Sequence, residues 1–155
     1  MSRVPAMRSR VPTVLGCVAA VLLALSLGGC VGNASGQLSL PREQAEASTY
    51  FVQRHAKDTR DLASGIADSM RTRGLKATAG IESDRPADAA FVVTYVDRWI
   101  WDMRMYLADL RIEVRDAKDQ SIVGFGQSSQ SSLKAMGQTH ADIVETALDQ
   151  LFPRR

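Results

Sequence analysis

Few side chains in this sequence have the types and spacing that catalysis or metal binding requires. The two histidines, His55 and His140, lie far apart and without the HxxxH-type spacing that places two metal ligands on one helix face. Asp97 and Asp102 would suit acid–base catalysis as a carboxylate pair, but arginines lie beside both, so ordinary ion pairs are the simpler interpretation. No phosphate-binding glycine loop and no G-x-S-x-G elbow occurs. The sequence therefore predicts no catalytic residues, no metal site and no cofactor, and we expect a protein that is not an enzyme.

The most unusual stretch of the chain runs from residue 97 to residue 106 and contains both tryptophans. Clustered Trp, Met and Arg side chains are typical of surfaces that bind a partner, so the candidate patch for a partner or ligand is Trp99, Trp101, Met103 and Tyr106. Large aromatic side chains are usually buried, and a role in capping the core is the favoured alternative. Joint exposure of the rings would reverse that preference. We predict a hairpin bend near residues 101–104 and a bulge or an irregular strand near Ala108, where the apolar positions change parity.

Both cysteines lie near the N-terminus. Cys17 falls inside an apolar run, and Cys30 closes that run directly after two glycines. Three arginines and no acidic residue precede the run. A basic segment followed by about 7–15 apolar residues and then small residues is typical of a secretory signal peptide. An uncleaved membrane anchor is the alternative, but the run barely reaches the ~20 apolar residues that a spanning helix needs.

The residues Leu27-Gly28-Gly29-Cys30 resemble the lipobox of bacterial lipoprotein precursors. The resemblance implies cleavage between Gly29 and Cys30 and a covalent lipid, with palmitate among its acyl chains, on Cys30. Lipoproteins of this kind that carry Asp after the cysteine are commonly retained in the inner membrane, whereas this chain has Val31. The resemblance therefore favours the periplasmic side of the outer membrane over the inner membrane.

The chain divides into an N-terminal targeting segment and a single folded domain. We predict a lipoprotein signal peptide over residues 1–29, a lipidated cysteine and flexible tether over 30–47, which is rich in small polar residues, and one α+β domain over 48–155. The formal charge of +2 comes from the arginines of the signal peptide, so the mature chain is nearly neutral. A nucleic-acid partner requires a basic surface, and we expect none.

Hydrophobic periodicity predicts the element order β-α-β-β-β-β-α. Apolar stripes with helical spacing fall in 58–74 and 139–152, and extended patterns in 49–52, 75–79, 89–96, 110–115 and 121–132. Residues 110–115 alternate strictly between apolar and charged side chains, which is typical of a strand with one face in solvent. Two amphipathic helices on a mainly antiparallel sheet of about four or five strands would form a two-layer α+β sandwich.

In its element order the mature part resembles small, mostly uncharacterised periplasmic α+β lipoproteins of Gram-negative bacteria. The leading hypothesis is a non-enzymatic interaction or envelope-accessory module that is anchored to the membrane and binds envelope proteins. The alternative is a lipoprotein that binds a small ligand or lipid in a pocket between sheet and helices near Trp99 and Tyr106. A filled core with exposed rings favours the first hypothesis, and a cavity lined by those rings favours the second. A pocket that joins a histidine to a carboxylate would revive an enzymatic role.

Overall fold

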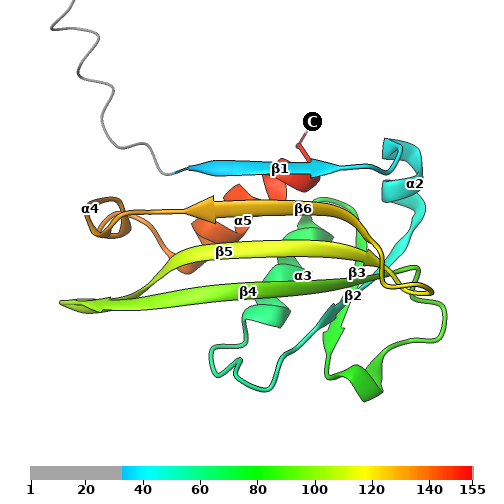
Figure 1. The fold of residues 1–155 in the computed structure, drawn as a ribbon, viewed down its shortest axis with the longest axis horizontal. Coiled ribbons are helices and arrows are strands. Elements are labelled where there is room, and N and C mark those ends of the chain that lie inside the picture. The colour runs from blue at the N-terminus through cyan, green and yellow to red at the C-terminus, as the bar shows by residue number, and fades with distance from the viewer. Residues whose placement is uncertain (1–32, 155) are drawn as a thin grey trace, which may run out of the picture. The chain divides into compact units, whose positions relative to one another are not determined.

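A computed structural model describes residues 33–154, which form one open six-stranded sheet and four α-helices (Figure 1). The strands are β1 (Ala34–Leu38), β2 (Thr49–Gln53), β3 (Lys76–Gly80), β4 (Phe91–Asp102), β5 (Arg104–Asp116) and β6 (Ile122–Ser129). The helices are α2 (Arg42–Ala47), α3 (Leu62–Thr72), α4 (Ser132–Ala135) and α5 (His140–Leu151), with a 3₁₀ turn at Glu82–Asp84. The predicted signal peptide, its cleavage site at Gly29 and the lipidation site at Cys30 lie outside the described residues.

The sheet has the strand order β1-β6-β5-β4-β2-β3. The strands β1, β6, β5 and β4 are antiparallel neighbours, whereas β2 pairs in parallel with both β4 and β3. The parallel pairing of β2 and β3 follows from the connection between them, because α3 carries the chain back to the same end of the sheet. The prediction of a mixed α+β fold is confirmed, but the antiparallel sheet of four or five strands matches only roughly.

Residues 34–47 differ most from expectation, since we predicted a flexible tether and find a strand and a helix. Strand β1 pairs with β6 from Ala34 opposite Ser128 to Leu38 opposite Gly124. Helix α2 buries Ala45, whose carbonyl accepts a 2.8 Å hydrogen bond from the hydroxyl of Tyr50. Small polar residues give no periodic signal, and β1 is held by backbone pairing to a neighbouring strand rather than by its own apolar side chains.

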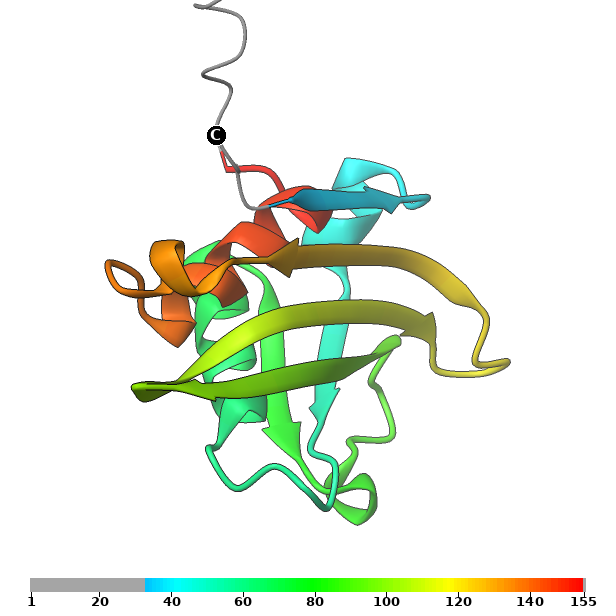
Figure 2. The same ribbon diagram turned by 60° about the vertical axis from the view of Figure 1, so that its left-hand side comes forward.

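Helices α3 and α5 cover one face of the sheet, as Figure 2 shows, and the core lies between the two layers. The predicted end of the first helix near Gly74 and the predicted start of the second at Thr139 are confirmed, whereas α3 begins at Leu62, four residues later than predicted. Gly74 adopts a φ of 83° just beyond α3, and Thr139 and Asp142 form a capping box at the start of α5. The most deeply buried large side chains are Tyr50, Phe51, Ile66, Met70, Leu107, Leu110, Ile112, Ile143 and Leu148. Within residues 33–154, no helix is long and apolar enough to cross a membrane.

Helix α5 rests almost directly on the backbone of β6. A Cβ atom at Gly126 would lie 2.1 Å from the carbonyl oxygen of Ala147, so only glycine fits at that position. A glycine within a helix can also allow a close approach to a sheet, but Gly65 in α3 is exposed, and a Cβ atom added there would have no heavy atom within 4 Å. The glycine that brings helix and sheet together is therefore in the strand and not in the helix.

Candidate functional site

The predicted bend near residues 101–104 is confirmed as a tight turn between β4 and β5. Strand β4 ends at Asp102 and β5 begins at Arg104, so the turn centres on Met103, which adopts a φ of 59°. Pairing of β5 with β6 stops where Asp109 lies opposite Ser129. The last part of the β4–β5 hairpin therefore extends beyond the rest of the sheet, as Figure 1 shows.

A β-bulge interrupts this hairpin at the position where the apolar pattern changes parity. Arg98 lies opposite Asp109, but the next residue, Trp99, lies opposite Leu107, which leaves Ala108 without a partner in the ladder. Because of the extra residue, the side chains beyond the bulge lie on the opposite face of the sheet from the one that simple alternation would give them. The predicted irregularity near Ala108 is thus confirmed, and it allows Leu107 as well as Leu110 to face the helices.

Trp99 lies against the core on the helix-covered face, where it is partly buried. Its indole Nε1 donates a 2.7 Å hydrogen bond to a carboxylate oxygen of Asp97. The guanidinium carbon of Arg60 lies 4.4 Å from the ring centroid, and the ring of His140 lies 6.3 Å from it. These contacts identify Trp99 as a residue that caps the core, which is the favoured alternative for this ring.

Tyr106 lies on the opposite face of the sheet from Trp99. It is buried with Ala108 and with Ala135 of α4, and Ile100 packs against the same small cluster. The alternation of side chains along β5 places Tyr106 away from the neighbouring Leu107, which faces the helices. The candidate patch is therefore divided between two faces, and Trp99 and Tyr106 do not line a common space between the sheet and the helices.

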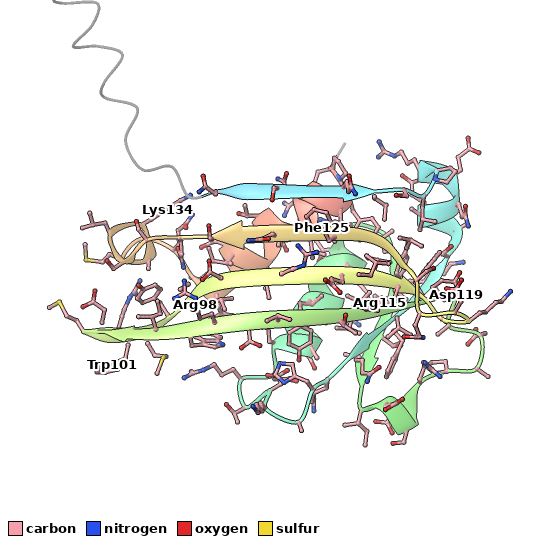
Figure 3. The ribbon with its side chains drawn as sticks, in the orientation of Figure 1. Arg98, Trp101, Arg115, Asp119, Phe125 and Lys134 are labelled. Atoms are coloured by element: carbon pink, nitrogen blue, oxygen red, sulfur yellow. The ribbon has the colours of Figure 1, made fainter. Side chains whose placement is uncertain are left out.

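The remaining members of the predicted patch, Trp101 and Met103, lie at the exposed end of the hairpin together with Met105. Two further exposed apolar residues, Leu133 and Met136, lie in and just after the short helix α4, which packs against Tyr106 on the other face of β5. We call the following five residues the apolar tip: Trp101 (70% exposed), Met103 (93%), Met105 (41%), Leu133 (77%) and Met136 (69%). They are five of the eight exposed large hydrophobic residues in the described chain. Figure 3 shows Trp101 and Lys134 of α4 at the same end of the molecule, with Asp119 at the other end. Exposure of large apolar side chains in one region is typical of a binding surface.

Leu133 and Met136 were not predicted as part of this site. The strand that we predicted ended at residue 132, and no element was predicted between it and the helix that begins at residue 139, whereas Ser132–Ala135 form the short helix α4. The signal for the site was the presence of two large apolar residues among serines, lysine and glycine. Arg104 and Lys134 lie beside these residues, and neither forms an ion pair with an acidic side chain within residues 33–154. The apolar tip is therefore flanked by two positive charges that no carboxylate neutralises.

A histidine and a carboxylate do meet elsewhere in the fold. Nε2 of His55 lies 2.9 Å from Oδ1 of Asp97, and Nδ1 of His55 accepts a hydrogen bond from the backbone N–H of Lys57 at 3.2 Å. Because Nδ1 accepts, Nε2 carries the proton and donates it to Asp97. Both ring nitrogens are thus engaged, so neither is available as a general base in this arrangement.

Asp58 connects the start of α3 to β4 close to the contact between His55 and Asp97. Its carboxylate accepts hydrogen bonds from the backbone N–H groups of Arg60, Leu62 and Ala63 and from the hydroxyl of Tyr95 at 2.6 Å. Burial raises the pKa of Asp58, but these four hydrogen bonds outweigh that effect and lower the pKa to about 2. Burial and the Asp58 carboxylate raise the pKa of Tyr95. The N-cap residue of α3 is Asp61, and Asp58 satisfies the first backbone N–H groups of the helix from outside it, so its role is structural.

The uncovered face of the sheet carries charged side chains that largely neutralise one another. Arg98 pairs with Asp109, and Glu113 pairs with both Arg111 and Arg115. Hydrogen bonds from these two arginines lower the pKa of Glu113, first that from Arg111, against the opposing effect of burial. Figure 3 shows Arg98, Arg115 and Phe125 along this face. The arrangement agrees with a solvated sheet surface whose cations are matched by acids.

A groove of about 780 Å³ opens at the end of β1 that is remote from the apolar tip. Its apolar lining includes Leu38, Leu40 and Phe152, and its charged rim includes Arg42 and Arg154. A second, polar hollow of about 610 Å³ lies at Gln53, Glu82, Arg85, Thr94, Arg115, Ala117, Lys118 and Gln120. The pair of histidine and carboxylate lines neither of these two hollows. In the part of the chain that the structure describes, no group of three or more His, Cys, Asp or Glu side chains is placed to hold a metal ion.

Comparison with known proteins shows the fold and no family. No protein-family model matches the sequence, and no curated protein matches it. Structures of the PelC dodecamer from Paraburkholderia phytofirmans and of a variant of it are 15% identical to the chain, with TM-scores of 0.58 and 0.57. They cover 80% and 81% of this chain and 100% of their own. The fold is shared with PelC. A minor lipoprotein from Acinetobacter baumannii, 14% identical over 63% of this chain and 82% of its own, has a TM-score of 0.30.

Proposed function

We propose that this chain is a periplasmic lipoprotein, anchored to the outer membrane through a lipid on Cys30, and that its domain acts as a non-enzymatic binding module. The observation that carries the proposal is the apolar tip, where Trp101, Met103 and Leu133 are all at least 70% exposed. Large apolar side chains in contact with water raise the free energy of the protein, and a partner that covers them lowers it. The tip is therefore the binding surface of the module.

The anchor is supported by the combination of a basic segment, an apolar run and Leu27-Gly28-Gly29-Cys30. Changing Cys30 to alanine tests it directly. The native protein should incorporate a labelled fatty acid and migrate as the processed form, whereas Cys30→Ala should take up no label and accumulate as the precursor. Normal processing and labelling of Cys30→Ala would overturn the anchor.

The binding module can be tested by chemical crosslinking in intact envelopes. We expect Trp101→Ala/Met103→Ser to lose crosslinks, whether to lipid or to protein, that the native protein forms, because both side chains are exposed and neither supports the core. Ile122→Ser is the matched control, since Ile122 is also exposed, at 49%, but lies at the other end of the sheet. Equal crosslinking of the native protein and the tip variant would overturn the assignment of the tip as the binding surface.

We include self-association through a surface other than the apolar tip in the proposal, because the similar PelC structures are dodecamers. The sheet is open, its edge strand β1 is exposed over Ala34–Gln37, and within residues 33–154 no strand pairs with the outer edge of β1. Native mass spectrometry of the purified protein tests this. A monomer over the micromolar range would exclude self-association without affecting the lipid anchor.

A second candidate function, the binding of a small ligand or lipid, is favoured by the groove beside β1 and α2. Its apolar lining and its arginines suit an amphiphile with an acidic head group, such as a long-chain fatty acid. Arg42 already pairs with Glu46 at 2.8 Å, and Arg154 pairs with Glu145 and Asp149, so such a ligand would compete with these carboxylates. Isothermal titration with a fatty acid should detect binding that Arg42→Glu weakens and that the exposed control Lys57→Glu leaves unchanged. No detectable heat with the native protein would exclude this function.

A further inference from the structure

We propose that the apolar tip inserts into the headgroup region of the phospholipid bilayer to which Cys30 is attached, so that the domain stands with its β4–β5 hairpin on the membrane. The inference deepens the proposed function and rests on its lipid anchor. It commits the binding surface to one occupant, the lipid surface. A second copy of the chain or another protein on the tip would be a contrary result.

The first step is the length of chain between the anchor and the fold. Asn33 is already held at the sheet, because its carbonyl accepts a 2.9 Å hydrogen bond from the backbone N–H of Ser129. Three peptide steps separate Cys30 from Asn33. At about 3.6 Å per residue, Cys30 lies within about 11 Å of the point where β1 joins the sheet. A lipid on Cys30 therefore keeps that end of the sheet close to the membrane.

The second step is how far the hairpin extends at the same end. Ser129 lies opposite both the start of β1 and Asp109 of β5, and β5 begins five residues earlier at Arg104. At about 3.3 Å per residue, the hairpin extends about 17 Å beyond Asp109, which is farther than Cys30 can reach. When the strands run along the membrane normal, Met103 thus lies at or below the level of the lipid-bearing cysteine.

The third step is the chemistry of the side chains that meet the lipid. Trp is enriched at membrane–water interfaces, and apolar Met and Leu beside it suit the boundary between headgroups and acyl chains. Arg104 and Lys134 make no ion pair in the described chain and are free to contact lipid phosphates while their stems lie along the apolar region. Asp102 at the same turn limits the depth, since a carboxylate is costly in hydrocarbon. The tip therefore suits the interface and not the bilayer centre.

Trp101 provides the readout. The full chain is expressed, the processed protein is purified from membranes, and it is reconstituted into vesicles of phosphatidylethanolamine and phosphatidylglycerol that carry bromine at shallow or deep acyl positions. Trp99→Phe leaves Trp101 as the single fluorophore. We expect shallow bromines to reduce its emission at least about twofold and deep bromines to reduce it less, because the side chain lies at the interface. The control Trp99→Phe/Trp101→Phe/Ile122→Trp places the fluorophore about 36 Å from the turn, where bromine should have no effect.

The outcomes separate the inference from the anchor on which it rests. Mass spectrometry of the same sample reports acylation of Cys30. Acylated protein whose Trp101 is not quenched would overturn the insertion of the tip and leave the anchor standing. A protein without acyl chains would overturn both. A blue-shifted Trp101 emission without quenching by bromine would show that protein, such as a second copy, covers the tip, and would also overturn the inference.

Discussion

Gly126 provides a sharp test of how α5 is seated on the sheet that carries the tip. In Gly126→Ala the new methyl group would lie 2.1 Å from the carbonyl oxygen of Ala147, more than about 1 Å closer than an ordinary van der Waals contact. The obstacle is helix backbone, so relief requires α5 to move and to disturb the packing of Ile143 and Leu151, both of which are buried. Overpacking of a core costs about 1–3 kcal/mol, and we expect the free energy of unfolding to fall by about 3 kcal/mol because the backbone itself must shift.

Gly65→Ala makes the same chemical change where space is free. Gly65 is exposed in the middle of α3, and nothing lies within 4 Å of the added methyl group. Alanine in place of a helical glycine should raise the free energy of unfolding by about 1 kcal/mol. Urea unfolding followed by far-UV circular dichroism measures both variants, and we expect shifts of the midpoint in opposite directions. A Gly126→Ala variant as stable as the native protein would refute the close seating of α5 on β6.

Three further predictions concern the region around the site. The ionised carboxylate of Asp58, whose pKa of about 2 lies below the ordinary 3.8, stabilises the fold above pH 4. Solvent screens this partly exposed group, so we expect about 1 kcal/mol of the free energy of unfolding to be lost as the pH falls from about 4 to about 2. Asp58→Asn should lack this loss in acid unfolding curves. Thr139→Ala removes the capping box of α5 and should lower the free energy of unfolding by about 1 kcal/mol, whereas Thr139→Ser should retain it. Trp101→Ala should change the free energy of unfolding by less than about 0.5 kcal/mol, because Trp101 is exposed, and Trp99→Ala should lower it by about 2 kcal/mol, because Trp99 packs against the core. Equal losses of the two variants in thermal unfolding would contradict the assignment of Trp101 to the surface and Trp99 to the core.

The sequence predicted best where a side-chain pattern repeats over many residues. The stripes of α3 and α5 and the strict alternation in β5 each depend on a buried face, and burial is what creates the pattern. The change of parity near Ala108 was also readable, because a bulge shifts every later side chain by one position. Local side-chain patterns thus gave the helices, the hairpin and the irregularity that shapes its end.

Features that depend on residues far apart in the sequence could not be predicted from local side-chain patterns. Strand β1 has small polar residues, and its pairing with β6 is decided by a neighbour about ninety residues away in the chain. Tyr106 and Trp99 were grouped by their closeness in sequence, although the pleat separates them. The contact of His55 with Asp97 joins residues 42 positions apart, and only the fold shows that it occupies both ring nitrogens. Long-range pairing therefore decided both what the site contains and what it lacks.

The positions of the tip and the groove make the two candidate functions compatible. Leu38 lines the groove and lies opposite Gly124 of β6, which in turn lies opposite Val114 of β5. Val114 is ten residues from Arg104, where β5 begins at the tip. That separation corresponds to about 33 Å, so a domain that stands on its tip presents the groove to the periplasm and not to the lipid. Sites this far apart without shared contacts should respond independently to substitution. Arg42→Glu should therefore weaken ligand binding without changing the quenching of Trp101, and an effect of Arg42→Glu on that quenching would show that the domain does not stand as the geometry requires.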